Sequence, residues 1–185
     1  ADGRSRRYWG LRLSVRRTIM TIITPNPTAC SLYNPPQIAF NQSIQFDLDM
    51  GVLTMQRMLV TYASRLGSTQ GVAEAIAEEL RTAHYDVTLL AMDGVYAVDG
   101  YDAVVIGSAI RGGQWLPEAV SFVDKFKVDL AQTPVAYFTV CLTLNKDTPE
   151  TRKVVADYLK PIREVLPAQA DDYFGGKAEP KELLF

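Results

Sequence analysis

The chain has 185 residues, of which 48% are hydrophobic and 22% charged, with a formal net charge of −2. These values fit one globular domain with an extension, and the charge gives no reason to expect nucleic acid as a partner. The two cysteines exclude a disulfide framework and indicate a reducing, cytoplasmic compartment, and no apolar run reaches the ~20 residues that a membrane-spanning helix needs.

Residues 1–56 show no sustained helix or strand periodicity. Six arginines fall within the first 17 residues, whereas almost all acidic residues follow Met50. An organelle-targeting segment, or a twin-arginine signal at Arg16 and Arg17, would also be rich in arginine. However, Pro25 ends the following apolar run and no small-residue cleavage site comes after it. We therefore predict an irregular extension over 1–56 and a separate domain over 57–185.

From Arg57 onward, apolar segments alternate with segments of helical periodicity. In chain order they are a strand at 58–63, a helix at 71–83, strands at 86–92 and 102–108, a helix at 116–126, a strand at 134–142, a helix that Asp147 or Thr148 caps, and a strand at 171–175. Val72, Ile76 and Leu80 share one face of the first helix. Pro149 suits the first turn of the last helix, and Pro161 should bend or shorten it.

This alternation, with short connections, predicts an α/β fold in which a parallel sheet carries helices on both faces. The continuous apolar centre of residues 102–108 indicates a strand buried on both sides. In such sheets ligands bind beyond the carboxyl ends of the strands, where the winding direction reverses. The loops after the first, third and fourth predicted strands are therefore the candidates for a site.

The first of these loops, SRLGST, runs from Ser64 to Thr69 and leads into a predicted helix. Unpaired N–H groups at the helix start and the hydroxyls of Ser64, Ser68 and Thr69 can hold an anion, and Gly67 lets the backbone approach it. Arg65 belongs to the same candidate site. The loop lacks the lysine of triphosphate-binding loops and the GxGxxG spacing of dinucleotide folds, so it suits a terminal phosphate monoester, as in FMN. The alternative is an ordinary Ser/Thr helix cap.

The loops after the third and fourth strands suit a flat ring. Gly112 and Gly113 allow a peptide to lie against the edge of a ring, and Ile110 or Trp115 can cover its face. The alternative for Trp115 is packing at the start of the next helix. The candidate ring-binding residues are Ser108, Ile110, Arg111, Gly112, Gly113, Trp115, Cys141 and Leu142.

Neither of two reactive side chains in this region is assigned to catalysis. Cys141 is better explained as a small buried residue than as a nucleophile, because the sole histidine, His84, lies elsewhere. Asp147 is better explained as a helix cap than as a catalytic acid. The sequence contains no metal-ligand cluster and no catalytic triad.

Three segments, YASRLGSTQGVAEAIAEEL, VVIGSAIRGGQWLPEAVSFV and FGGKAEPKELLF, resemble the flavodoxin-domain family that includes the quinone-dependent protoporphyrinogen IX oxidases. The resemblance covers about residues 57–185 and implies a doubly wound, five-stranded parallel sheet in the order 2-1-3-4-5. It also implies that the loops at 108–115 and 140–143 hold a flavin ring. The phosphate of the implied FMN would be bound by Ser64, Gly67, Ser68 and Thr69. The family's last helix is not evident before Phe185, so we expect a chain that is incomplete at its C-terminus.

The resemblance implies an FMN-dependent oxidoreductase that takes electrons from a tetrapyrrole precursor and passes them to a quinone. The alternative is a flavodoxin-type electron carrier that docks partner proteins and has no substrate of its own. Carriers usually show an acidic docking face, whereas this domain is only mildly acidic, which favours an enzyme. An interaction module with an empty site is disfavoured by the hydroxyl-rich loop. Oxidase-like members of the family carry an extra segment between the final strand and the last helix for membrane or oligomer contacts, and this sequence ends too early to show it. The resemblance alone therefore implies, as one option for a cytoplasmic protein, peripheral association with a membrane.

Overall fold

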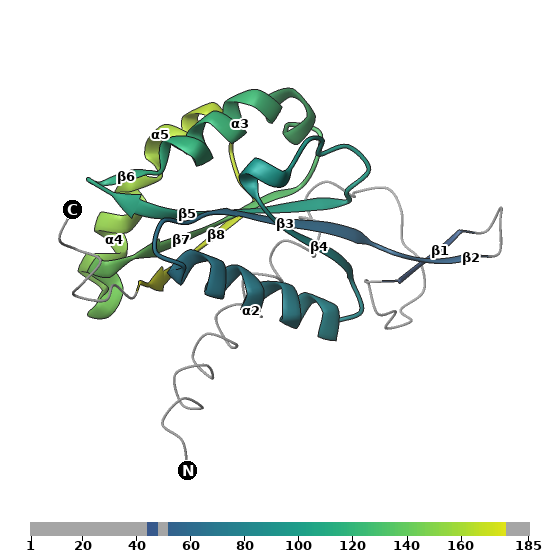
Figure 1. The fold of residues 1–185 in the computed structure, drawn as a ribbon, viewed down its shortest axis with the longest axis horizontal. Coiled ribbons are helices and arrows are strands. Elements are labelled where there is room, and N and C mark those ends of the chain that lie inside the picture. The colour runs from purple at the N-terminus through teal and green to yellow at the C-terminus, as the bar shows by residue number, and fades with distance from the viewer. Residues whose placement is uncertain (1–43, 48–51, 177–185) are drawn as a thin grey trace, which may run out of the picture.

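The computed structural model describes residues 44–47 and 52–176, and its main feature is a parallel sheet between helices (Figure 1). The five parallel strands follow the order β4-β3-β5-β7-β8, which is 2-1-3-4-5 by position in the chain. This order confirms the predicted fold class. The strands are β3 (Arg57–Ala63), β4 (Asp86–Ala91), β5 (Ala103–Arg111), β7 (Val135–Cys141) and β8 (Ala170–Gly175).

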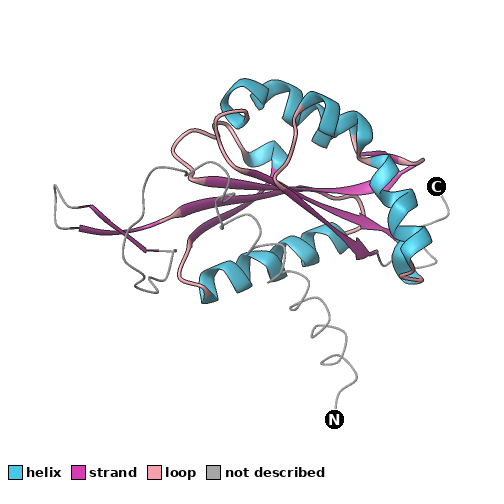
Figure 2. Ribbon diagram, turned by 180° about the vertical axis from the view of Figure 1, so that it is seen from behind, coloured by secondary structure: helices cyan, strands magenta, loops and turns pink. Residues whose placement is uncertain are grey.

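Helix α2 (Ser68–Thr82) covers one face of the sheet, and Figures 1 and 2 both show it below the strands, on the side opposite α3 and α5. Its buried residues Val72, Ile76 and Leu80 pack in one cluster with Met58 and Val60 of β3. The spacing of four residues between them is the helical periodicity seen in the sequence. The helix begins at Ser68 rather than at residue 71, so it starts directly after the SRLGST loop.

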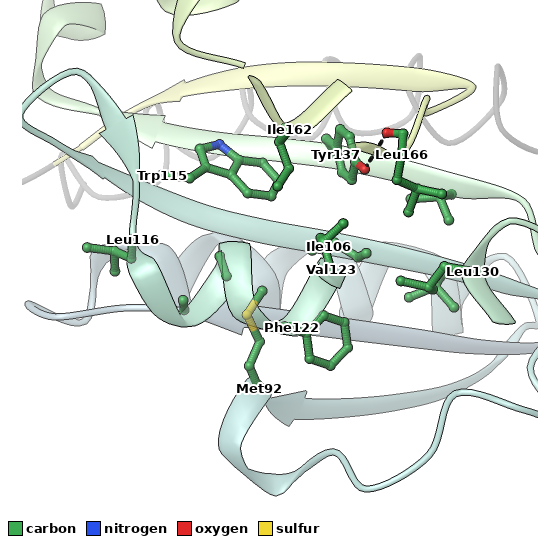
Figure 3. Close-up of a cluster of buried hydrophobic side chains, with 14 of the residues drawn as sticks. Met92, Ile106, Trp115, Leu116, Phe122, Val123, Leu130, Tyr137, Ile162 and Leu166 are labelled. Atoms are coloured by element: carbon green, nitrogen blue, oxygen red, sulfur yellow. Dashed lines mark hydrogen bonds between the residues drawn. The ribbon is translucent and has the colours of Figure 1, made fainter. Parts of the chain in front are cut away.

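The opposite face carries α3 (Pro117–Leu130) and α5 (Lys160–Val165). Ile106 of β5, Val123 of α3 and Ile162 of α5 belong to the core on this side (Figure 3). The buried hydroxyl of Tyr137 donates a hydrogen bond of 2.7 Å to the carbonyl oxygen of Leu166 and so fixes the segment after α5 against the sheet. The chain therefore switches from one face to the other between β3 and β5.

A short hairpin extends the third parallel strand, which the sequence pattern did not predict. Strand β5 continues to Arg111, and β6 (Gln114–Trp115) turns back antiparallel to it. The turn residues Gly112 and Gly113 have φ values of 60° and 77°. A two-residue hairpin turn with positive φ at both positions needs residues without a Cβ penalty, which explains the glycine pair.

The last helical region is divided, as Pro161 predicted. Helix α4 (Pro149–Tyr158) ends before α5 begins at Lys160. Thr148, not Asp147, caps α4, because the Thr148 side chain accepts from the Thr151 N–H while the Thr151 hydroxyl accepts from the Thr148 N–H. Asp147 instead accepts two hydrogen bonds from the Arg152 guanidinium.

Part of the predicted irregular extension is ordered. β1 (Ile44–Asp47) and β2 (Val52–Met55) pair as antiparallel strands, which corrects that expectation for these residues. Residues 1–43, 48–51 and 177–185 lie outside the described part. The expectation that the family's last helix is missing concerns residues 177–185, so it stays a prediction. Within the described residues, no helix has the length and apolar character needed to cross a membrane.

Candidate functional site

A cleft of about 370 Å³ opens at the carboxyl ends of β3 and β4. Its walls are the end of β3, the loop that follows it, the turn after β4 and the start of α3. The helices that follow β3 and β5 lie on opposite faces of the sheet, so the cleft is at the point where the winding direction reverses (Figure 1). This is the position at which doubly wound sheets bind ligands.

The loop between β3 and α2 makes a tight turn at Gly67. Gly67 adopts the left-handed conformation with φ 77°, which a residue with a side chain rarely takes. The Gly67 N–H donates to the Ser64 hydroxyl at 3.1 Å, so Ser64 tightens the turn. Ser64, Arg65 and Gly67 all line the cleft.

Helix α2 begins without a side-chain cap. Gly67 occupies the cap position, no side chain of the described residues bonds to the first-turn N–H groups as a cap, and the first turn holds no acidic residue. Helix α4 is different, because Thr148 and Thr151 cap it reciprocally. The start of α2 thus keeps unpaired N–H groups and partial positive charge beside the cleft.

Thr69, in the first turn of α2, carries a buried hydroxyl. Its side chain is fully buried, and Oγ1 has no hydrogen-bond partner among the described residues. The helix-cap alternative required this group to bond to the backbone. A buried hydroxyl without a partner costs about 1–3 kcal/mol, which a ligand acceptor or donor would offset. Thr61 of β3 has a similarly buried, unpartnered hydroxyl, and nothing in the sequence pattern had singled it out.

Two acidic residues of the cleft were also missed by sequence analysis. Glu118, in the first turn of α3, forms an ion pair with Arg65, and Asp93 lies in the turn after β4. Tyr62 lines the same cleft, where burial and then the charges of Glu74 and Asp93 raise the pKa of its hydroxyl. Each of these residues looks like an ordinary surface or strand position in sequence.

The predicted ring-binding residues do not line this cleft but lie at the ends of the neighbouring strands. Ala109 of β5 stands in register with Val140 of β7, which places the two loops side by side at the same edge. Leu142 follows β7 with 46% of its surface exposed. Arg111 and Gly112 are exposed at the tip of the hairpin. The structure therefore leaves parts of both loops accessible to a ligand.

Trp115 packs in the core, which was the alternative to a role in covering a bound ring. The indole is only 4% exposed, its Nε1 donates to Thr139 Oγ1 at 2.9 Å, and its ring meets Tyr137 edge-on at 5.0 Å between centroids (Figure 3). With its polar atom bonded and its faces in the core, the ring is not available to cover a flavin. The structure thus corrects its assignment as a ring-covering residue.

Several other predicted ring residues also serve the fold. The Ser108 hydroxyl accepts from the Leu116 N–H at 3.0 Å and holds the start of α3. A Cβ on Gly113 would lie 3.3 Å from the Tyr158 ring, so this glycine lets the hairpin pack on α4. Cys141 is buried, as predicted, and its thiol bonds to the Thr143 hydroxyl at 3.2 Å. Within the described residues, no group of acidic, histidine and cysteine side chains could hold a metal ion.

Comparisons with known proteins agree with this architecture. The sequence model of the flavodoxin domain family matches residues 59–184. Protoporphyrinogen IX dehydrogenase (quinone) of Escherichia coli strain K12 is 28% identical over 108 residues, covering 56% of this chain and 60% of that protein. The Leishmania major protein of the same name is 27% identical over 109 residues, covering 56% of this chain and 47% of that protein. The match therefore spans less than two thirds of each relative.

A solved structure shows the same fold. Oxidised flavodoxin 1 of Bacillus cereus superposes with a TM-score of 0.51 at 20% identity, covering 69% of this chain and 89% of that protein. At this identity the superposition supports the strand order and helix placement and carries no information about the residues of the site.

Proposed function

Because the chain belongs to the flavodoxin domain family, we propose that it binds FMN at the carboxyl edge of its sheet and serves as an FMN-dependent oxidoreductase. The observation that supports this proposal most directly is the fully buried hydroxyl of Thr69, which has no partner among the described residues and lies in a helix that begins without a side-chain cap. A phosphate monoester is the group that would use both features at once, because its oxygens accept hydrogen bonds and its charge favours a helix N-terminus.

The phosphate would be held by the Thr69 and Ser68 hydroxyls and the first-turn N–H groups of α2. Ser64 contributes by holding Gly67 in the turn, since its hydroxyl accepts the Gly67 N–H. These contacts alone are too weak for a tightly held cofactor. Capping and dipole effects supply about 0.3–2 kcal/mol each, whereas a nanomolar complex needs about 12 kcal/mol. Most of the affinity must come from burial of the ring.

The ring would lie against the loops that follow β5 and β7. The accessible residues there are Ile110, Arg111, Gly112 and Leu142, and the glycine backbone offers N–H and carbonyl groups to a ring edge. FMN, when bound, supplies the electron-transfer chemistry, and the protein supplies binding, orientation and the local electrostatics. No side chain of this chain is required to act as a nucleophile or a metal ligand.

We further propose a quinone as the electron acceptor and protoporphyrinogen IX as the electron donor. The support is the shared ancestry with the two protoporphyrinogen IX dehydrogenases, whose name specifies a quinone. A flavodoxin-type carrier remains the competing function, because the fold alone fits it equally.

The test uses the full chain with the flavin that it retains through purification, and the same protein supplemented with FMN for the activity assay. We expect acid-released flavin to be FMN, because the loop offers one phosphate site, and protoporphyrinogen IX to be oxidised when a soluble quinone is present. Release of FAD, or no uptake of micromolar FMN, would contradict the cofactor assignment. Electron exchange with quinones without any oxidation of the tetrapyrrole would identify a carrier instead.

A further inference from the structure

The Arg65–Glu118 ion pair crosses the cleft between two segments that are far apart in sequence. Arg65 belongs to the loop after β3, and Glu118 to the first turn of α3, which follows β5. Both residues also line the cleft. The pair therefore links two walls of the cleft, and Gly67 at the uncapped start of α2 lines the same cleft.

The charges of the cleft are unfavourable to an anion while this pair is closed. Arg65 is the single cationic side chain among the described residues that line it, and Glu118 and Asp93 are both acidic. While the Arg65 guanidinium is paired with Glu118, the remaining charge in the lining of the cleft is the Asp93 carboxylate, which repels a phosphate. The same guanidinium, once released, could bind phosphate oxygens through two parallel N–H groups.

The ion pair is suited to exchange. The side chains of Arg65 and Glu118 are 55% and 48% exposed, so water already solvates much of each charge. Exposed ion pairs contribute little to stability and open at small cost. Glu118 keeps a favourable position when released, because its carboxylate lies at the positive end of α3.

We propose that Glu118 sets the affinity of the site for a phosphate monoester by holding Arg65 in the ligand-free protein, and that Arg65 transfers from this carboxylate to the incoming phosphate. The proposal rests on the FMN-binding function above and adds the residue that tunes it. Glu118 acts through Arg65 and is a positioning residue. Arg65 contacts the ligand phosphate.

The test is a fluorescence titration of four proteins with FMN and with riboflavin, which lacks the phosphate. Glu118→Gln should lower the dissociation constant for FMN about threefold to tenfold, because it removes the competing charge. Arg65→Gln should raise it about tenfold, since one charge-assisted contact is lost. In the Arg65→Gln background, adding Glu118→Gln should change FMN binding little. Riboflavin binding should be the same in all four.

Two controls separate this mechanism from general effects. Glu150→Gln removes the same charge from the first turn of α4, away from the lining of the cleft, and should leave FMN affinity unchanged. The gain from Glu118→Gln should shrink when salt is raised from about 0.1 M to about 1 M, because screening weakens the competing ion pair.

Weaker FMN binding by Glu118→Gln would overturn the proposal, because it would show that the pair holds the loop in its binding shape. An equal change for riboflavin, or a gain that persists without Arg65, would also overturn it. If the wild-type protein binds FMN and the variants bind it with the same dissociation constant, the proposed function stands and the role of Glu118 is wrong. If wild type binds neither flavin, both fall.

Discussion

Replacing Thr69 by valine should change the stability of the ligand-free protein and its FMN affinity in opposite directions. Valine keeps the β-branched shape and removes one of the two hydroxyls, those of Thr61 and Thr69, that are buried without a partner among the described residues. Relief of an unpaired buried polar group is worth about 1–3 kcal/mol, so the ligand-free domain should become more stable. For a domain of this size, a gain of about 1–2 kcal/mol raises the melting temperature by roughly 4–8 °C.

The same substitution should weaken FMN binding. Loss of a hydrogen bond to a charged group costs about 1.5–3 kcal/mol, which corresponds to roughly a tenfold to hundredfold higher dissociation constant. Riboflavin affinity should hardly change, because the loops after β5 and β7 are untouched. The assays are thermal unfolding without ligand and fluorescence titration with both flavins. Thr69→Ala should show the same selective loss of FMN affinity.

Thr139→Val is the matched control for stability. Thr139 is also fully buried, but its hydroxyl accepts the Trp115 indole N–H, so its removal leaves a buried donor unpaired. This variant should lose about 1–3 kcal/mol of stability. If Thr69→Val destabilises the ligand-free protein as Thr139→Val does, the Thr69 hydroxyl is bonded within the protein and is not held for a ligand. Equal losses of FMN and riboflavin affinity would refute the phosphate assignment.

Three further predictions concern packing, the extension and pH. Gly107→Ala should destabilise the fold by about 1–3 kcal/mol or more in a denaturant titration, because its Cβ would lie 1.8 Å from the Phe138 ring. Deleting residues 1–49 removes β1, which pairs with β2 in a two-stranded sheet separate from the parallel sheet, so the melting temperature and FMN affinity should stay nearly unchanged, and a large loss of either would show that the segment packs on the domain. Burial, with a hydrogen bond to Asp171, raises the pKa of Tyr173 to about 12 from 10.0, so the protonated hydroxyl is favoured in the fold and unfolding free energy should fall between these pH values. Tyr173→Phe should reduce that slope, and an unchanged slope would contradict the assignment.

The order of strands and helices could be predicted from the sequence, because each element has a local signal. Val72, Ile76 and Leu80 share a helix face wherever that helix packs, and Pro161 interrupts a helix in any surroundings. The alternation of such elements leaves few arrangements other than a parallel sheet with helices on both faces. The SRLGST loop could be found for the same reason, since its hydroxyls, glycine and following helix are adjacent in the chain.

The partners of individual side chains depend on tertiary structure. From the sequence, the Trp115 indole could face either a ligand or the core. Its position depends on Thr139, which is 24 residues away in the chain and reaches Nε1 only after β5, β6 and β7 assemble. Arg65 and Glu118 are 53 residues apart and meet because α2 and α3 begin at the same edge of the sheet. Hydrogen bonds and ion pairs form between atoms a few ångströms apart, and for distant segments the packing of the elements sets that distance.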